Sequence, residues 1–169
     1  TLRSCATLDR QTMRLIRCDM GSHVLAVCLT VLEVATPAKP HDRAMAVCYE
    51  VGAAAHDAGL PVALVVALAY TESRLNPLAA SSRRAVGPLQ IVPVWHCPGG
   101  KARGCDLIQA GVDALVRYRK LYGPAWSDVL CHWSQGNRCW AVGRSFARTV
   151  LGRAEMFRHG AMVMEADTW

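Results

Sequence analysis

One apolar stretch, residues 62–69, constrains this chain more than any other feature of its sequence. It reads Val-Ala-Leu-Val-Val-Ala-Leu-Ala, and it follows Pro61, a residue that favours the first turn of a helix. The alternation of polar and apolar residues that marks a half-buried strand is not sustained here or elsewhere. A helix that is apolar all round belongs inside a domain. We therefore expect a helix from Val62 to about Leu75, buried at the centre of the fold.

The segments around this run predict further helices. Helical spacing of apolar residues and capping signals predict helices over residues 42–59, 106–123 and about 140–157, with a short helix after Ser127. Asp42 and Asp106 stand at the expected N-caps of two of them. Residues 76–105 hold several prolines and glycines and predict an irregular segment. The expected fold class is all-α, a compact helical domain with a buried central helix.

Composition agrees with one globular domain and points to an anionic partner. The chain has 169 residues, of which 52% are hydrophobic and 19% charged, and this balance excludes disorder. No stretch approaches the roughly 20 apolar residues that a membrane-spanning helix needs. The net charge is +6, and residues 74–153 hold twelve basic side chains against three acidic ones. Such an excess favours nucleic acid, a membrane surface or an acidic wall polymer, with a solvated surface as the alternative.

The amino-terminal segment has the pattern of an export signal. Arg14 and Arg17 precede the apolar run 24–32, and small residues follow as far as Ala38. A basic flank, a short apolar core and a small residue are typical of a signal peptide, with cleavage after Ala38. We therefore assign residues 1–38 to a signal peptide or N-terminal extension and residues 39–169 to the domain. The alternative is an amphipathic or buried first helix.

Eight cysteines indicate an oxidising compartment, either the periplasm or the cell exterior. Cys97 and Cys105 are eight residues apart, as are Cys131 and Cys139, and each pair brackets a polar, glycine-containing loop. Two loop-closing disulfides fit this spacing better than zinc, whose structural sites favour tighter ligand pairs. A zinc site that includes neighbouring histidines is the alternative.

The pairing of Cys48 depends on the amino-terminal segment. If residues 1–38 are removed, five cysteines stay in the chain and Cys48 is the unpaired one. If the segment is retained, Cys48 can pair with Cys5, Cys18 or Cys28.

Glu72 is an anomaly because it follows the most apolar segment of the domain. Its neighbours on the helix face are Val65, Leu68 and Ala69. Apolar surroundings disfavour a charged carboxylate and raise its pKa. A general acid must carry its proton near neutral pH, so this environment suits such a role. The alternative is that Glu72 ends the helix and points into water.

A set of motifs in a fixed order accompanies Glu72. They are Glu72-Ser73, Asn76-Pro77, Ala80-Ser81, Ala85-Val86-Gly87-Pro88-Leu89-Gln90-Ile91 and Trp133-Ser134-Gln135-Gly136. The set resembles the catalytic domain of the soluble lytic transglycosylase and goose-type lysozyme superfamily, over about residues 42–155. The resemblance implies a lysozyme-like α-domain that cleaves the β-1,4 bond between N-acetylmuramic acid and N-acetylglucosamine in peptidoglycan.

The resemblance also implies a role for each matching residue. Glu72 corresponds to the family's single catalytic acid and base, and Ser73 to a neighbour that helps to hold the sugar or the carboxylate. Gln90 corresponds to a substrate-contacting glutamine. Ser81 and Ile91 belong to the same motifs and are expected to contact substrate.

Two motif positions depart from the family. Trp133 and Ser134 stand where most members have tyrosine and asparagine, and we still expect both to contact substrate. The family's tyrosine offers its hydroxyl to the catalytic carboxylate. Whether an indole N–H replaces that donor is open at this point.

The acidic residues favour a one-acid mechanism. No Asp or Glu lies between Glu72 and Asp106, whereas ordinary glycosidases use two carboxylates. We therefore expect lytic transglycosylase activity, with formation of 1,6-anhydro-N-acetylmuramic acid. A goose-type muramidase and a catalytically weakened wall-binding module are the alternatives. The expected partner is the peptidoglycan glycan strand, bound by a monomer without a metal ion, a cofactor, nucleic acid or a stable membrane span in the mature chain.

Overall fold

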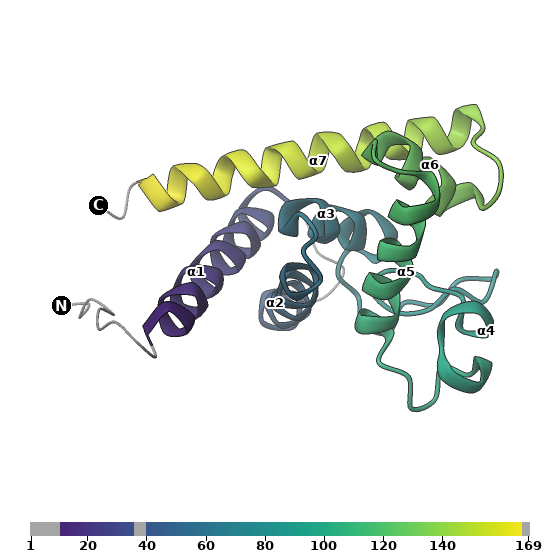
Figure 1. Ribbon diagram of the computed structural model, residues 1–169, viewed down its shortest axis with the longest axis horizontal. Coiled ribbons are helices and arrows are strands. Elements are labelled where there is room, and N and C mark those ends of the chain that lie inside the picture. Colours follow the sequence, from purple (N-terminus) through teal and green to yellow (C-terminus); the bar gives the residue numbers. More distant parts are fainter. Residues whose placement is uncertain (1–10, 36–39, 167–169) are drawn as a thin grey trace.

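The structure is a computed structural model that describes residues 11–35 and 40–166 (Figure 1). Its elements are α1 (Gln11–Val34), α2 (His41–Asp57), α3 (Val62–Ser73), α4 (Pro93–His96), the 3-10 helix η1 (Pro98–Gly100), α5 (Leu107–Tyr122), α6 (Trp126–Gln135) and α7 (Ala141–Ala166). The described residues contain no strand, only isolated bridges within residues 80–91. The all-α fold class is confirmed.

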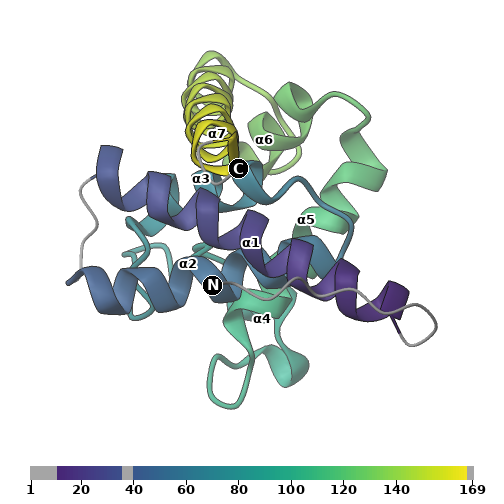
Figure 2. The ribbon, with the colours of Figure 1, turned by 90° about the vertical axis from the view of Figure 1, so that its left-hand side faces the viewer.

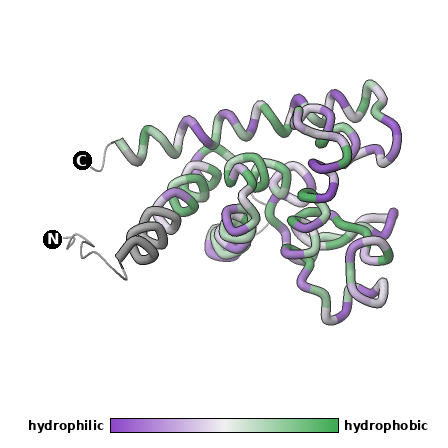
Figure 3. The backbone as a smooth tube through the Cα atoms, in the orientation of Figure 1, coloured by the Kyte–Doolittle hydropathy of each residue, from purple (hydrophilic) through white to green (hydrophobic). Residues whose placement is uncertain are grey.

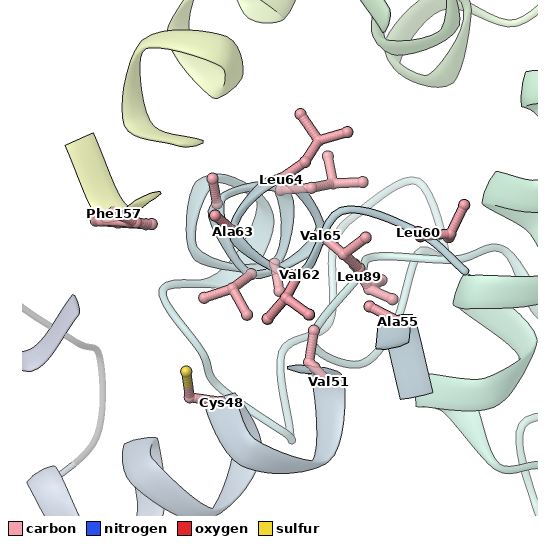
Figure 4. Close-up of a cluster of buried hydrophobic side chains, with 14 of the residues drawn as sticks. Cys48, Val51, Ala55, Leu60, Val62, Ala63, Leu64, Val65, Leu89 and Phe157 are labelled. Carbon is pink, nitrogen blue, oxygen red and sulfur yellow. The ribbon is translucent and has the colours of Figure 1, made fainter. Parts of the chain in front are cut away.

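Helix α3 forms the centre of the core. Every residue from Val62 to Ala69 is buried, and α3 is hydrophobic along most of its length (Figure 3). Side chains of α2 and α7 surround it, together with Leu89 from the irregular segment that follows it (Figure 4). An all-round apolar helix is stable only when neighbours cover each of its faces. The predicted buried central helix is therefore confirmed.

The other helices enclose α3 from several directions. Helix α7 passes over α3 and continues along α1, while its first turns pack against α6 (Figure 1). Helix α1 crosses near α2, as the view turned by 90° shows (Figure 2). Helix α5 contacts both α2 and α6. The segment between α3 and α5, which includes α4, forms a lobe on the side of the molecule away from α1.

Two helix boundaries differ from those expected. Asp42 lies inside the first turn of α2, because Pro40 occupies the N-cap position and its carbonyl accepts the Ala44 N–H at 3.0 Å. Helix α7 runs to Ala166 rather than to Phe157, since α1 provides a surface for its second half. Asp106 does cap α5, where its Oδ1 accepts the N–H groups of the second and third helical residues at 3.1 and 3.0 Å.

Residues 21–34 of α1 contribute to the hydrophobic core. Val24, Val27 and Val31 are at most 1% exposed, and Cys28 forms a disulfide with Cys48 of α2. This is the buried first helix that the sequence left as an alternative. The expected cleavage position after Ala38 lies outside the described residues, so removal of residues 1–38 stays a prediction. None of the helices in the described part is long and apolar enough to cross a membrane.

Cutting the chain after Ala38 tests how much α1 contributes to the fold. The cut removes three buried valines and half of the Cys28–Cys48 disulfide. We expect the free energy of unfolding, measured in urea, to fall by at least about 3 kcal/mol, the value typical of a disulfide loop of this length. Equal stability of the cut and whole chains would instead identify α1 as a dispensable leader.

Candidate active site

Glu72 lies in the last turn of α3, where the backbone leaves the helix abruptly. Arg74 and Leu75 both adopt positive φ, 53° and 59°, and Leu75 turns into the core, where it is fully buried. Left-handed residues commonly end helices in this way. The chain therefore turns away after Ser73, and the Glu72 carboxyl group borders a cleft instead of a further helical turn.

The cleft beside Glu72 has a volume of about 470 Å³. It is lined by Glu72, Ser81, Arg83, Ala85, Gln90, Ile91, Val92, Trp95, His96, Tyr118, Trp133, Ser134, Gln135, Val142 and Phe146. These residues come from the end of α3, the irregular segment with α4, and the helices α5, α6 and α7. Residues far apart in the sequence thus meet around one carboxyl group.

Ser73 is the one expected contact residue that does not line the cleft. Its hydroxyl donates to the Ala69 carbonyl at 3.0 Å and accepts the Asn76 N–H at 3.2 Å. The side chain therefore holds the end of α3 and the turn after it. A serine at a helix end commonly satisfies the local backbone in this way.

Trp133 provides the hydrogen bond to the carboxyl group. Its indole Nε1–H donates to Glu72 Oε1 at 2.9 Å, and the ring of Tyr118 packs edge-on against the indole at 5.5 Å. Both Trp133 and Ser134 belong to α6, not to a loop as expected. The indole thus occupies the position of the donor that the sequence left open.

Burial raises the pKa of Glu72 from its ordinary value of 4.5 to about 7. The hydrogen bond from Trp133 acts in the opposite direction, because it stabilises the carboxylate, but desolvation is the larger effect. At neutral pH a substantial fraction of the molecules therefore carries a proton on Glu72. Among the described residues that line the cleft, Glu72 is the one acidic side chain.

A tight turn carries Gln90 to the cleft. Gly87 has φ of 77°, and a Cβ atom there would meet the Leu107 side chain at 3.0 Å. Gln90 itself has φ of 49°, and its Nε2 donates to the Gly87 carbonyl at 2.9 Å. Backbone bonds between Val86 and Ile91 close the turn. A glycine is required because the turn combines positive φ with close packing on α5.

The segment around α4 forms another part of the cleft wall. Trp95 is 76% exposed, an unusual state for so large an apolar side chain. Beside it, His96 Nδ1 lies 3.1 Å from the Arg117 guanidinium of α5. Desolvation, and then the charge of Arg117, lower the pKa of His96. The imidazole is therefore a neutral acceptor that attaches this segment to α5.

Some cleft residues were not expected from the sequence. Tyr118 has helical spacing typical of core residues, and Phe146 lies in the last predicted helix, so both were identified only as helix positions. Val142 was not identified, and Arg83 was counted only as one of the basic residues of 74–153. Arg83 is an exposed cation on the irregular segment, and only the tertiary fold shows that it borders the cleft.

Two disulfides hold the cleft segments. Cys97 is bonded to Cys105 and Cys131 to Cys139, so the zinc alternative for these four cysteines is wrong. In the part of the chain that the structure describes, no group of three or more His, Cys, Asp or Glu could hold a metal ion. The second disulfide forms between the expected cysteines and joins α6 to the segment before α7, so the residues that it encloses are partly helical.

Comparison with known proteins supports the resemblance seen in the sequence. Residues 50–98 match the family model of the transglycosylase SLT domain. The matched segment runs from α2 to η1 and includes Glu72 and Gln90, but it ends before Trp133. Comparisons with curated proteins and with solved structures give no significant match.

Replacing Glu72 tests its burial independently of any activity. A carboxyl whose pKa is raised on folding favours the native state while it is protonated, and this contribution is lost as pH rises from about 4.5 to about 7. Glu72→Gln cannot ionise, so we expect it to be more stable than wild type at pH 8 by roughly 2 kcal/mol, allowing for partial exposure. At pH 4 the two proteins should unfold nearly alike.

Urea unfolding at both pH values provides the measurement, and Glu50→Gln on the exposed surface of α2 provides the control. The control should leave the difference between the two pH values unchanged. A Glu72→Gln variant that gains no stability at high pH would contradict the raised pKa.

Proposed function

We propose that this protein, whose residues 50–98 match the transglycosylase SLT domain, is a peptidoglycan lytic transglycosylase with Glu72 as its single catalytic acid and base. The observation that carries the proposal is the state of Glu72. It is an acid with a pKa of about 7, held by one indole N–H at the floor of a cleft. A group poised near neutral pH can both give and take a proton.

In the proposed reaction Glu72 protonates the glycosidic oxygen as the bond from that oxygen to the anomeric carbon breaks. The leaving N-acetylglucosamine keeps this proton as its 4-hydroxyl. The acetamido oxygen of N-acetylmuramic acid stabilises the positive anomeric carbon. The 6-hydroxyl of the same sugar then attacks that carbon and gives its proton to the Glu72 carboxylate. The product has a 1,6-anhydro ring, Glu72 is protonated again, and no water is consumed.

The composition of the cleft supports a one-acid mechanism. Glycosidases with two carboxylates need the second group roughly 5–10 Å from the first. The described residues that line this cleft include no second Asp or Glu. The substrate's own acetamido group supplies the missing stabilisation in our proposal. Hydrolysis by an ordered water remains the competing reaction, and product analysis separates the two.

The surroundings of the cleft suit an anionic wall polymer. Arg83 borders the cleft and is exposed, and the charge of residues 74–153 is strongly positive. Carboxylates of muramic acid and of stem peptides would be attracted to such a surface. The three disulfides favour an oxidising compartment, so we propose that the protein acts in the periplasm or outside the cell.

Digestion of purified sacculi tests the proposed function. We expect wild type to release muropeptides with 1,6-anhydro ends, detected by mass spectrometry. Glu72→Gln should retain the fold but lose at least about 100-fold in rate, because general acid catalysis typically contributes that much. Reducing ends that have gained water would instead identify a muramidase. Equal inactivity of a folded wild type and the variant would favour a wall-binding module.

Trp95 provides a test of substrate binding. An exposed indole at a cleft is suited to stacking on a sugar ring, so Trp95→Ala should raise KM about fivefold to tenfold with little change in kcat. Trp140→Ala is the matched control, since Trp140 is 56% exposed but does not line the cleft. An equal rise in KM for both variants would argue against a specific stacking contact.

A further inference from the structure

The bond between Trp133 and Glu72 has a chemical direction. An indole nitrogen carries a hydrogen and can only donate. In a neutral carboxyl group both oxygens can accept, but the oxygen without the hydrogen is the stronger acceptor. The N–H of Trp133 lies 2.9 Å from Glu72 Oε1. If the proton of the neutral carboxyl were on Oε1 and directed toward the indole, two hydrogens would face each other. The proton is therefore excluded from that direction, and donation from the indole to Oε1 favours the form of the neutral carboxyl that carries its proton on Oε2.

We infer that Trp133 is a positioning residue that confines the catalytic proton of Glu72 to Oε2, so that one oxygen both protonates the leaving group and recovers the proton from the attacking hydroxyl. This inference rests on the proposed function of Glu72. It assigns to Trp133 a task that differs from substrate contact. A tyrosine hydroxyl in the same place could donate or accept, so it would permit the proton on either oxygen.

The packing around Trp133 holds the indole in this orientation. Tyr118 of α5 packs edge-on against the indole, and Tyr122, one turn further along, lies 5.5 Å from Tyr118. The ring of Tyr122 stacks on His132 at 3.8 Å with the planes 8° apart. His132 Nδ1 in turn lies 2.8 Å from the Gly136 carbonyl, which can accept only from a protonated nitrogen. These successive ring contacts thus connect Trp133 to His132, which lies on the same helix, α6.

The other ionisable groups near Glu72 do not bond to its carboxyl. The cleft also contains Arg83, His96 and Tyr118, and Arg153 of α7 approaches the preceding turn. Arg153 donates to the Thr71 hydroxyl at 2.9 Å rather than to Glu72. In the described part of the chain, Trp133 supplies the one hydrogen bond to this carboxyl. The position of the proton therefore depends on a single donor.

Use of one oxygen for both proton transfers restricts the reaction geometry. The attacking hydroxyl must approach from the face that the leaving oxygen has just left. The 6-hydroxyl of the same sugar can reach the anomeric carbon from that β face, and its attack closes the 1,6-anhydro ring. Confinement of the proton to Oε2 is thus compatible with the proposed product and does not require Glu72 to rotate between the two steps.

Indole NMR of the whole protein tests the bond directly. The chain has five tryptophans, and the resonance that is lost in Trp133→Phe identifies the Trp133 N–H. We expect this resonance to titrate with a midpoint near pH 7 and to move downfield as Glu72 becomes a carboxylate, a stronger acceptor. In Glu72→Gln it should be independent of pH and lie near the low-pH position of wild type. A Trp133 N–H chemical shift that changes neither with pH nor in Glu72→Gln would overturn the inference.

The pH dependence of kcat/KM on sacculi provides a second test of the inference. Loss of the donor in Trp133→Phe removes the effect that lowers the pKa of Glu72. The high-pH limb of the kcat/KM profile, where activity falls as Glu72 ionises, should therefore move up by about one pH unit. We also expect kcat to fall about tenfold, because the carboxyl loses its orientation. Trp133→Tyr keeps a donor and should restore the limb toward its wild-type position.

The two tests separate this inference from the proposed function. A folded, active Trp133→Phe with an unchanged high-pH limb would overturn the inference and leave Glu72 as the acid. A wild type that shows the titrating indole but cleaves no glycan would overturn the proposed function and leave the bond intact.

Discussion

The structure depends on burial of a helix that has no polar face. Helix α3 is stable only because α1, α2, α7 and Leu89 cover it, and that cover continues almost to its last turn. Glu72 therefore lies where burial excludes most of the water, yet its carboxyl group still borders the cleft. The same desolvation that stabilises the apolar side chains raises the pKa of this carboxyl, so the packing of the core and the acidity of the site share one physical cause.

One part of the cleft wall, the lobe between α3 and α5, has little hydrophobic core of its own. The lobe between α3 and α5 contains two bridges, a four-residue helix and a short 3-10 helix. Its stability comes from the turn around Gly87, the Cys97–Cys105 disulfide and the contact between His96 and Arg117. Each disulfide that closes a short loop typically contributes about 2–4 kcal/mol. The Cys97–Cys105 disulfide thus supplies stability that this lobe does not obtain from buried apolar surface.

The buried helix and the raised pKa of Glu72 could be predicted because both follow from residues within one helical segment. Contacts between distant segments could not. The bond from Trp133 to Glu72 spans 61 residues, and only the packing of α6 beside α3 creates it. Ser73 was expected to serve the substrate, but its hydroxyl satisfies its own helix end. The length of α7 was underestimated because it depends on α1, a segment whose composition is also typical of an export signal.

Consecutive residues of α5 contact two different parts of the cleft wall. Arg117 contacts His96 in the segment that carries Trp95, and Tyr118 packs against the indole that holds Glu72. Neighbouring positions on a helix are separated by about 100° around its axis, so one short stretch can face both directions. One turn of α5 therefore contacts both the α4 segment and α6. A substitution that displaces this turn of α5 would therefore disturb the surroundings of Trp95 and of Glu72 at the same time.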